Sequence, residues 1–203
     1  MSATGLRERN RARTHGEILE AALDLFETEG FDATTIEDIA AAAEVSPRTF
    51  FRYFDSKVDV VVAVSGGEAG PDEIEALIRA RPPEEHPARA LLEVMRNQVP
   101  PSSGDDPRVR QYRIVMATPS LRAPFLDLFQ ERERHVAAAF AARLRRDPDD
   151  IVVQMLAAAA VAALRHSFTR WVAGGAKPGQ LWPSVEEALT LLEREFRSPA
   201  RAE

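Results

Sequence analysis

The sequence contains no cysteine, which excludes disulfides, thiolate nucleophiles and cysteine-ligated zinc. It also lacks a long apolar run, because the longest nearly apolar one, 151–164, has 14 residues, and a transmembrane helix needs about 20. No apolar segment follows the N-terminal arginines, so a secretory signal is not expected. We therefore expect a cytoplasmic protein with no membrane anchor, and a length of 203 residues is enough to bury a core.

The sequence also lacks the motifs of common enzymes. Its four histidines form no HExxH pair, and it contains no glycine-rich phosphate loop and no nucleophile elbow. Glu131 and His135 are four residues apart and could share a metal ion on one helix face, but their charged neighbours favour a solvated surface. We expect a protein that is not an enzyme and that has no resident cofactor or metal.

Positive charge is scarce overall, since the net charge is -6, but it is unevenly distributed. Residues 1–16 hold four arginines and one glutamate, residues 17–44 hold nine acids and no base, and residues 45–58 hold three basic residues and one aspartate. If the two basic segments converge in space, they form a surface that attracts phosphate. The alternative is that the arginine-rich end is a solvated tail.

The apolar pattern after this basic end predicts three helices. In the first, apolar residues recur at helical spacing up to Phe26, and Gly30 offers the left-handed conformation that ends a helix. Phe31 is then expected to pack back on Phe26. Thr34 or Thr35 caps a second, short helix, with an acidic capping-box partner three residues further on.

A third helix is predicted to follow after a break of about three residues. Ser46 is its N-cap and Pro47 its first residue, where the missing N–H costs nothing. Two short helices joined by a tight turn, with a supporting helix before them, are typical of a helix-turn-helix, whose second helix enters the major groove of DNA. The residues placed to touch DNA are Ser46, Pro47, Arg48, Thr49 and Arg52.

Residues 15–58, HGEILEAALDLFETEGFDATTIEDIAAAAEVSPRTFFRYFDSKV, resemble the DNA-binding domain of the TetR family of bacterial transcription regulators. The resemblance lies in the opening ILEAALDLF, the junction GFDATTIEDIA, the helix VSPRTFFRYF and the following SK. It implies an all-α fold, with an N-terminal three-helix helix-turn-helix domain and a C-terminal helical ligand-binding and dimerisation domain. It further implies that DNA is contacted by Thr34, Thr35, Phe51, Tyr53 and Lys57 in addition to the residues above.

Two residues depart from the family pattern. Glu44 stands in the turn where the family usually has glycine, so we expect mild strain there. Phe51 stands where the family commonly has tyrosine, which replaces a phosphate hydrogen bond with an apolar contact, for example to a thymine methyl group.

Three regions are expected along the chain: a flexible basic arm at 1–16, the DNA-binding domain at 17–58, and the ligand-binding and dimerisation domain at 59–203. The arm could reach the minor groove or the backbone of DNA. In the C-terminal domain the pattern predicts long helices at 88–98, 108–117, 121–146, 149–173 and 185–197.

The resemblance implies that the last two long helices form a homodimer interface. The small side chains of Ala157–Leu164 suit such an interface, as does the stripe formed by Val185, Leu189, Leu192 and Phe196. It also implies a ligand pocket among the remaining helices. The candidate lining residues are Met95, Gln98, Tyr112, Met116, Phe125, Phe129, Met155, His166 and Phe168, for which ordinary core packing is the alternative.

The sequence therefore predicts a ligand-responsive transcription regulator, most often a repressor in this family. It would bind a near-palindromic operator as a homodimer and be released by a small-molecule effector. The segment RQYR at 110–113 and the run Phe168–Val172 resemble regulators of the mycofactocin-system type, which implies an apolar or acyl effector. The alternative is a helical ligand-binding or protein-interaction module that retains the helix-turn-helix as a scaffold only.

Overall fold

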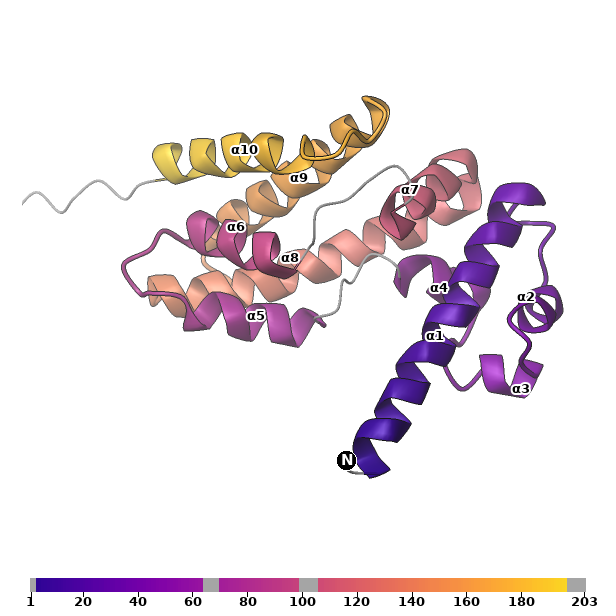
Figure 1. Ribbon diagram of the computed structural model, residues 1–203. Coiled ribbons are helices and arrows are strands. Elements are labelled where there is room, and N and C mark those ends of the chain that lie inside the picture. The colour runs from indigo at the N-terminus through magenta and orange to yellow at the C-terminus, as the bar shows by residue number, and fades with distance from the viewer. Residues whose placement is uncertain (1–2, 64–69, 99–105, 197–203) are drawn as a thin grey trace, which may run out of the picture. The chain divides into compact units, whose positions relative to one another are not determined.

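The computed structural model describes residues 3–63, 70–98 and 106–196, and these form ten α-helices and one short 3-10 helix without any strand (Figure 1). The prediction of an all-α fold is confirmed. The chain divides into two compact units, Met1–Ser65 with Asp105–Phe125 and Gly66–Gly104 with Leu126–Glu203. This division differs from a single boundary after residue 58, because a segment distant in sequence, Asp105–Phe125, packs with the first unit.

The first unit is built around one long helix. Its elements are α1 (Ala3–Thr28), α2 (Ile36–Ala42), α3 (Pro47–Phe50), α4 (Lys57–Ala63), α7 (Pro107–Ala117) and the 3-10 helix Pro119–Leu121. The helix α1 packs against α2, α4 and α7 (Figure 1). The core of the unit consists of apolar side chains that are almost fully buried, among them Ile18, Leu23, Ile39, Phe50 and Val60.

The end of α1 follows the prediction. Gly30 has φ 90°, the left-handed conformation that favours glycine. Phe31 folds back on Phe26, with their ring centroids 5.0 Å apart, so the predicted contact is confirmed. Thr35 is the N-cap of α2 and forms a reciprocal capping box with Asp38.

The start of α1 differs from the prediction. The segment expected to be a flexible arm is helical from Ala3 and continuous with the rest of α1. This segment contains no proline, and its four arginines and two alanines favour helix over coil. The prediction of a flexible arm rested on the charge of this segment and not on its helix propensity.

The helix α7 is fixed to α1 by a charged cluster. Arg110 forms ion pairs with Glu20, Asp24 and Glu27, at 2.7, 2.5 and 2.7 Å. Next to it, the buried Gln111 donates from Nε2 to the carbonyl oxygen of Val61 at the end of α4. These contacts explain why α7 belongs to the first unit.

The turn between α2 and α3 contains the expected strain. Glu44 has φ 54°, where a glycine would be unstrained. We expect Glu44→Gly to raise the free energy of unfolding by about 0.5–1 kcal/mol, since the strain released exceeds the added entropy of the unfolded chain. Thermal unfolding followed by far-UV circular dichroism measures the change. The control is Ala43→Gly, at φ -83°, which should lower stability by a similar amount; a Glu44→Gly protein that is less stable than the wild type would contradict the assignment.

The second unit contains the remaining helices. They are α5 (Pro71–Ala80), α6 (Pro87–Gln98), α8 (Arg122–Leu144, whose first residues belong to the first unit), α9 (Ile151–Ala173) and α10 (Leu181–Glu195). The helix α10 packs against both α9 and α6, and α5 packs against α6. Ion pairs join α6 to α10, from Arg89 to Glu193 at 3.2 Å and from Arg96 to Glu186 at 2.8 Å.

The helix α10 begins earlier than predicted. The pair Ser184 and Glu187 was expected to start a helix at Val185, but α10 begins at Leu181 and includes Pro183 in its first turn. Proline is tolerated there because the first N–H groups of a helix have no partner within the helix. The predicted end at Arg197 lies outside the described residues.

The helix α9 corrects the expectation that no segment is long and apolar enough to cross a membrane. It has 23 residues and a mean hydropathy of 1.6 over its best 18-residue window, which satisfies the criterion of length and composition. It nevertheless forms part of the core of the second unit, where Val153, Leu156, Ala160 and Trp171 are buried. A core helix passes the same test, so this finding is weak evidence for a membrane span.

Candidate nucleic-acid interface

The short helix α3 is held by its own N-terminal residues. The Ser46 hydroxyl accepts a hydrogen bond from the backbone N–H of Thr49 at 3.1 Å, and the two hydroxyl groups lie 2.9 Å apart. Pro47 follows as the first residue of the helix. The predicted cap is confirmed, and it fixes the direction of α3 relative to α2.

The side chains around α3 divide into a buried and an exposed set. Phe50 and Phe54 are buried and pack against each other with ring centroids 5.8 Å apart. Arg48 and Arg52 are exposed, and Phe51 is 53% exposed, which is unusual for a large apolar side chain. The exposed side of α3 and of the turn that follows it thus presents two guanidinium groups and an aromatic ring to solvent.

Two of the predicted phosphate contacts have other partners in the structure. Thr34 is buried, and its hydroxyl donates to the carbonyl oxygen of Gly30 at 2.9 Å. Lys57 donates from Nζ to the carbonyl oxygens of Phe31 and Thr34, at 2.6 and 2.9 Å, and its ammonium lies 4.4 Å from the Phe31 ring centroid. Both residues therefore hold the loop between α1 and α2 in place.

Thr35 is exposed, but its hydroxyl donates to the Asp38 carboxylate and accepts from the Asp38 backbone N–H. Hydrogen bonds from the hydroxyl and the backbone of Thr35 lower the pKa of the Asp38 carboxyl.

The residues predicted to line a ligand pocket are divided between the two units. Tyr112, Met116 and Phe125 belong to the first unit, and the other six belong to the second. Met116, Met155 and His166 are exposed. Phe125 is buried, and the half-buried residues are Met95, Gln98, Tyr112, Phe129 and Phe168.

Two of these half-buried rings pack against other side chains. Phe168 lies against Trp171, with ring centroids 5.6 Å apart. Phe129 is flanked by the guanidinium groups of Arg132 and Arg165, at 5.5 and 5.7 Å from its ring centroid. Burial lowers the pKa of Arg132 to about 10. These contacts agree with the alternative of ordinary core packing at both positions.

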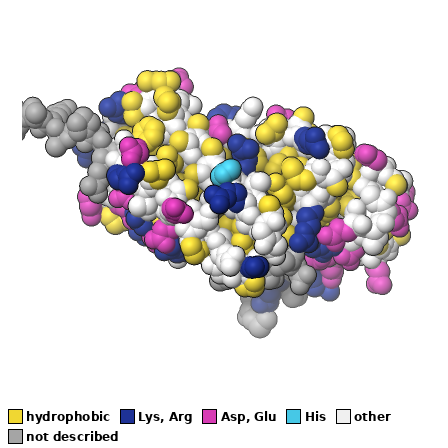
Figure 2. Space-filling view, turned by 90° about the horizontal axis from the view of Figure 1, so that it is seen from above, with side chains coloured by type: hydrophobic (Ala, Val, Ile, Leu, Met, Phe, Trp, Pro, Cys, Tyr) yellow, Lys and Arg dark blue, Asp and Glu magenta, His cyan; other side chains and the backbone are white. Residues whose placement is uncertain are grey.

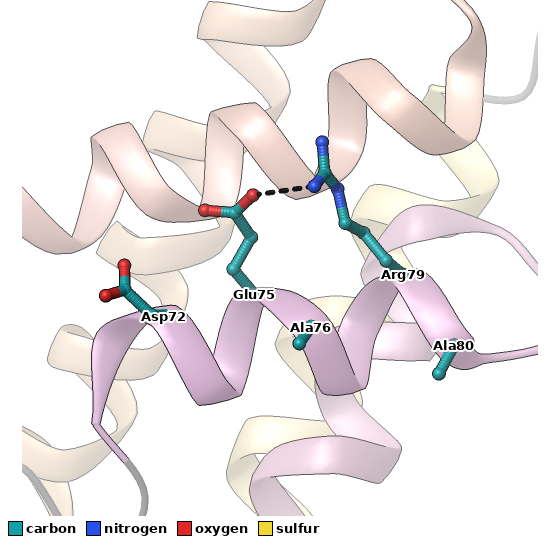
Figure 3. A pocket seen from close by; sticks show the side chains of 5 residues that line it. All are labelled: Asp72, Glu75, Ala76, Arg79 and Ala80. Atoms are coloured by element: carbon teal, nitrogen blue, oxygen red, sulfur yellow. Dashed lines mark ion pairs between the residues drawn. The ribbon is translucent and has the colours of Figure 1, made fainter.

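One group of described residues could offer three ligand atoms to a cation. His135 Nδ1 lies 3.6 Å from Asp72 Oδ1 and 3.5 Å from Glu75 Oε2, so its acidic neighbours are on α5. Glu75 also pairs with Arg79 at 3.2 Å, beside a cavity of about 480 Å³ (Figure 3). Because Arg79 already neutralises Glu75, the local charge favours an ion-pair group that joins α5 to α8 over a cation site.

Some of the residues predicted to form a dimer interface are buried within one chain, and the others are half-buried. Val185 and Leu189 are 2% and 1% exposed, and Ala157, Ala160 and Val161 are buried as well. The large apolar residues that α9 and α10 expose are instead Ile151, Val152, Met155 and Leu191. Figure 2 shows hydrophobic side chains reaching the surface among charged ones on the side of the molecule where α9 and α10 lie.

Two parts of the chain match described families. Residues 18–64 match the bacterial regulatory proteins of the tetR family, and residues 82–197, more than half of the chain, match the MftR C-terminal domain. The chain belongs to the TetR family. The predicted resemblance is thereby confirmed, and the chain is a TetR-family transcription regulator with a helix-turn-helix DNA-binding domain.

Relatives in the TetR family are regulators rather than enzymes. The HTH-type transcriptional regulator TcmR of Streptomyces glaucescens is 37% identical over 153 residues, which cover 72% of this chain and 67% of TcmR. The regulator MftR of Mycobacterium tuberculosis is 27% identical over 169 residues, which cover 81% of this chain and 82% of MftR.

Solved structures of the TetR family share the fold. NalD of Pseudomonas aeruginosa, a repressor of the MexAB-OprM efflux pump, superposes with a TM-score of 0.58 at 22% identity, over 90% of this chain and 96% of NalD. The repressor FadR of Thermus thermophilus, in complex with lauroyl-CoA, superposes with a TM-score of 0.53 at 22% identity, over 93% of this chain and 98% of FadR.

Proposed function

We propose that this TetR-family regulator is a repressor that binds a near-palindromic operator as a homodimer and is released by a small-molecule effector. The observation that carries the proposal is the exposed side of α3 and of the turn after it. Arg48, Phe51 and Arg52 lie there, directly after the helix start that Ser46 caps. A solvent-exposed phenylalanine between two arginines has no role in the core, and it suits a groove lined by bases and phosphates. We place the protein in the cytoplasm, where its operator would be.

Within this interface each side chain has a chemical role. Arg48 is placed to donate to a base edge, as bidentate arginine–guanine contacts are the commonest specific ones in the major groove. Phe51 offers an apolar contact to a thymine methyl group. Ser46, Pro47 and Thr49 form the helix start that approaches the backbone, and Arg52 and Tyr53 follow it.

The homodimer is supported by the exposed apolar side chains of the second unit. Ile151, Val152 and Met155 lie at the start of α9 and are 69%, 41% and 57% exposed, and Met155 is four residues from Ile151 and three from Val152. The half-buried Ala158 and Ala162 continue the same helical stripe. A face of large and small apolar residues on a helix hairpin is suited to a second copy of the chain, and two copies bring two recognition helices to two half-sites.

The effector is proposed to be apolar or acyl. The match to the MftR C-terminal domain and the shared fold with FadR, which binds lauroyl-CoA, support this class. Once an operator is known, this effector class is tested by measuring whether lauroyl-CoA releases the protein from the operator and free coenzyme A does not.

The operator itself is obtained by selecting random duplex DNA on the purified protein and measuring binding of the winning sequence at several salt concentrations. The proposal expects a near-palindromic winner bound by a dimer, with affinity that falls steeply as salt rises. A well-folded protein that enriches no sequence would instead support a helical ligand-binding or interaction module.

We expect Arg48→Ala to lower affinity for the selected operator by about 5- to 150-fold, or about 1–3 kcal/mol, and to relax the base preference at one position of each half-site. Competition binding against operators changed at single positions measures both effects. The matched control is Arg113→Ala, which removes the same charge from an exposed position of α7 in the same unit. Equal losses of operator affinity in the two variants would show that Arg48 acts only through its charge and does not contact a base.

A further inference from the structure

The ring of Phe129, on α8, holds two positively charged side chains next to each other. The guanidinium of Arg132, on the same helix, lies 5.5 Å from the ring centroid, and that of Arg165, on α9, lies 5.7 Å from it. All three residues belong to the second unit. Two guanidinium groups from different helices are therefore held at one aromatic ring, although like charges repel each other.

Arg132 is partly withdrawn from water. Its side chain is half-buried, and burial lowers its pKa to about 10, although the charge of Glu131 on the same helix raises it. The group still carries its charge at neutral pH, because neutral pH is well below this pKa. Solvent screens this charge less than it screens the charge of an exposed arginine, so a negative ligand that reaches Arg132 interacts with it more strongly.

Arg165 offers a second and more accessible guanidinium. Its side chain is exposed, and among the residues that the structure describes no carboxylate lies within ion-pair distance of it. A guanidinium is planar and presents its N–H donors as a fork, which matches the two oxygens of a carboxylate or a phosphate. Arg165 therefore has donors available to a ligand with such a group.

Aromatic surface lies next to this pair of arginines. On α9, Phe168 lies three residues after Arg165 and on the same side of the helix. Phe168 packs against the buried Trp171, with ring centroids 5.6 Å apart. Both Phe129 and Phe168 are half-buried, so they pack against other side chains and still keep part of their ring area accessible. An apolar chain attached to the anion would have aromatic surface to contact.

We propose that Arg132 and Arg165 bind an oxyanion of the effector, and that Phe129 and Phe168 contact its apolar chain. The inference rests on the proposed function, in which a small apolar or acyl molecule releases the operator, and it adds that this molecule is negatively charged. A neutral molecule would leave the repulsion between the two guanidinium groups uncompensated. Two sources supply this chemistry, the carboxylate of a free fatty acid and the phosphates of an acyl-coenzyme A.

The test measures ligand binding to the full-length protein by isothermal titration calorimetry, without DNA. The ligands are dodecanoate, dodecanol and lauroyl-CoA, which share one chain length and differ in the charged group. We expect the ligand that supplies the oxyanion to bind at least about tenfold more tightly than dodecanol, because dodecanol makes no charge-assisted hydrogen bond. Free coenzyme A should bind more weakly than lauroyl-CoA, since it lacks the apolar chain.

Two matched variants test the role of the guanidinium. Arg165→Gln should weaken binding of the charged ligand about tenfold and leave binding of dodecanol within about twofold. The protein should stay folded and keep its mass in solution, because the position is exposed. Arg170→Gln removes the same charge from another exposed position of α9 and should bind every ligand like the wild type. Arg165→Lys should recover part of the lost affinity, because it keeps the charge and loses the fork.

The response of each ligand to Arg165→Gln distinguishes the two sources. Weaker binding of dodecanoate assigns the oxyanion to a carboxylate, and weaker binding of lauroyl-CoA alone assigns it to a phosphate. The inference is overturned if the wild type binds none of the three ligands, if it binds dodecanol as tightly as both charged ones, or if Arg165→Gln and Arg170→Gln lose equal affinity. Failure of the proposed function is distinguishable, because it appears in the selection of an operator and does not affect ligand binding measured without DNA.

Discussion

Replacing Arg143 with alanine is expected to lower the free energy of unfolding of the second unit by about 3 kcal/mol. The Arg143 guanidinium, on α8, donates to four carbonyl oxygens, those of Ile78 and Arg81 at 3.1 and 2.9 Å and those of Pro82 and Glu85 at 2.6 Å each. These carbonyls end α5 and form the loop after it, where a helix leaves its last carbonyls without partners. Alanine would leave all four without this donor, and the hydrogen bonds to Ile78, Arg81 and Glu85 are partly buried.

Urea unfolding followed by tryptophan fluorescence measures this loss. Both tryptophans, Trp171 and Trp182, are in the second unit, so the signal reports the unit that contains Arg143. Arg134→Ala, an exposed arginine on the same helix, should change stability by less than about 0.5 kcal/mol. The stability of Arg143→Lys should lie between those of Arg143→Ala and the wild type, because an ammonium reaches fewer of the carbonyls. A midpoint for Arg143→Ala equal to that of Arg134→Ala would show that the four hydrogen bonds contribute nothing.

Local signals in the sequence were sufficient to predict the helix-turn-helix. Its caps depend on residues at most four apart, such as Thr35 with Asp38 and Ser46 with Thr49, and the strain at Glu44 follows from the turn alone. The association of α7 with the first unit could not be predicted in this way. It depends on Arg110, whose partners on α1 are more than 80 residues away.

The candidate site was predicted in part, for a related reason. The exposed side of α3 follows from helical spacing, which separates Arg48 and Arg52 from the buried Phe50. A sequence cannot show that Lys57 bonds to the carbonyls of a distant loop, so its role was assigned by resemblance. Arg11 was considered as part of a flexible arm that could reach DNA, although Asn10 and Thr14, four residues apart, lie on one side of a helix with it. The helix propensity of residues 1–16 would have indicated this arrangement.

The sequence also could not show which apolar residues pack in the core and which are free to form an interface. The stripe of Val185 and Leu189 has the periodicity of a dimer helix, but in one chain it already packs against α6 and α9. Periodicity shows that a face is buried and does not show by what. The exposed Ile151 and Met155 became visible as interface candidates only once the internal packing was known.

The double variant Ile151→Glu with Met155→Glu is therefore expected to dissociate the proposed homodimer and to weaken operator binding by at least about 100-fold. Each substitution occurs twice in a twofold interface, and each removes an apolar side chain worth about 1.5–3 kcal/mol when fully buried while placing a charge there. The protomer should remain folded, because both side chains are more than half exposed within one chain and glutamate favours helix near an N-terminus. Sedimentation equilibrium measures the mass, and operator binding is measured on the same samples.

The matched control for this variant is Leu126→Glu, which introduces the same charge at an apolar residue of α8 that is 52% exposed. It should leave both the dimer and the operator affinity unchanged. A double variant that stays dimeric would place the interface elsewhere on the chain. A variant that becomes monomeric and keeps its affinity would instead show that one recognition helix is enough, which contradicts the argument that two half-sites must be bound together.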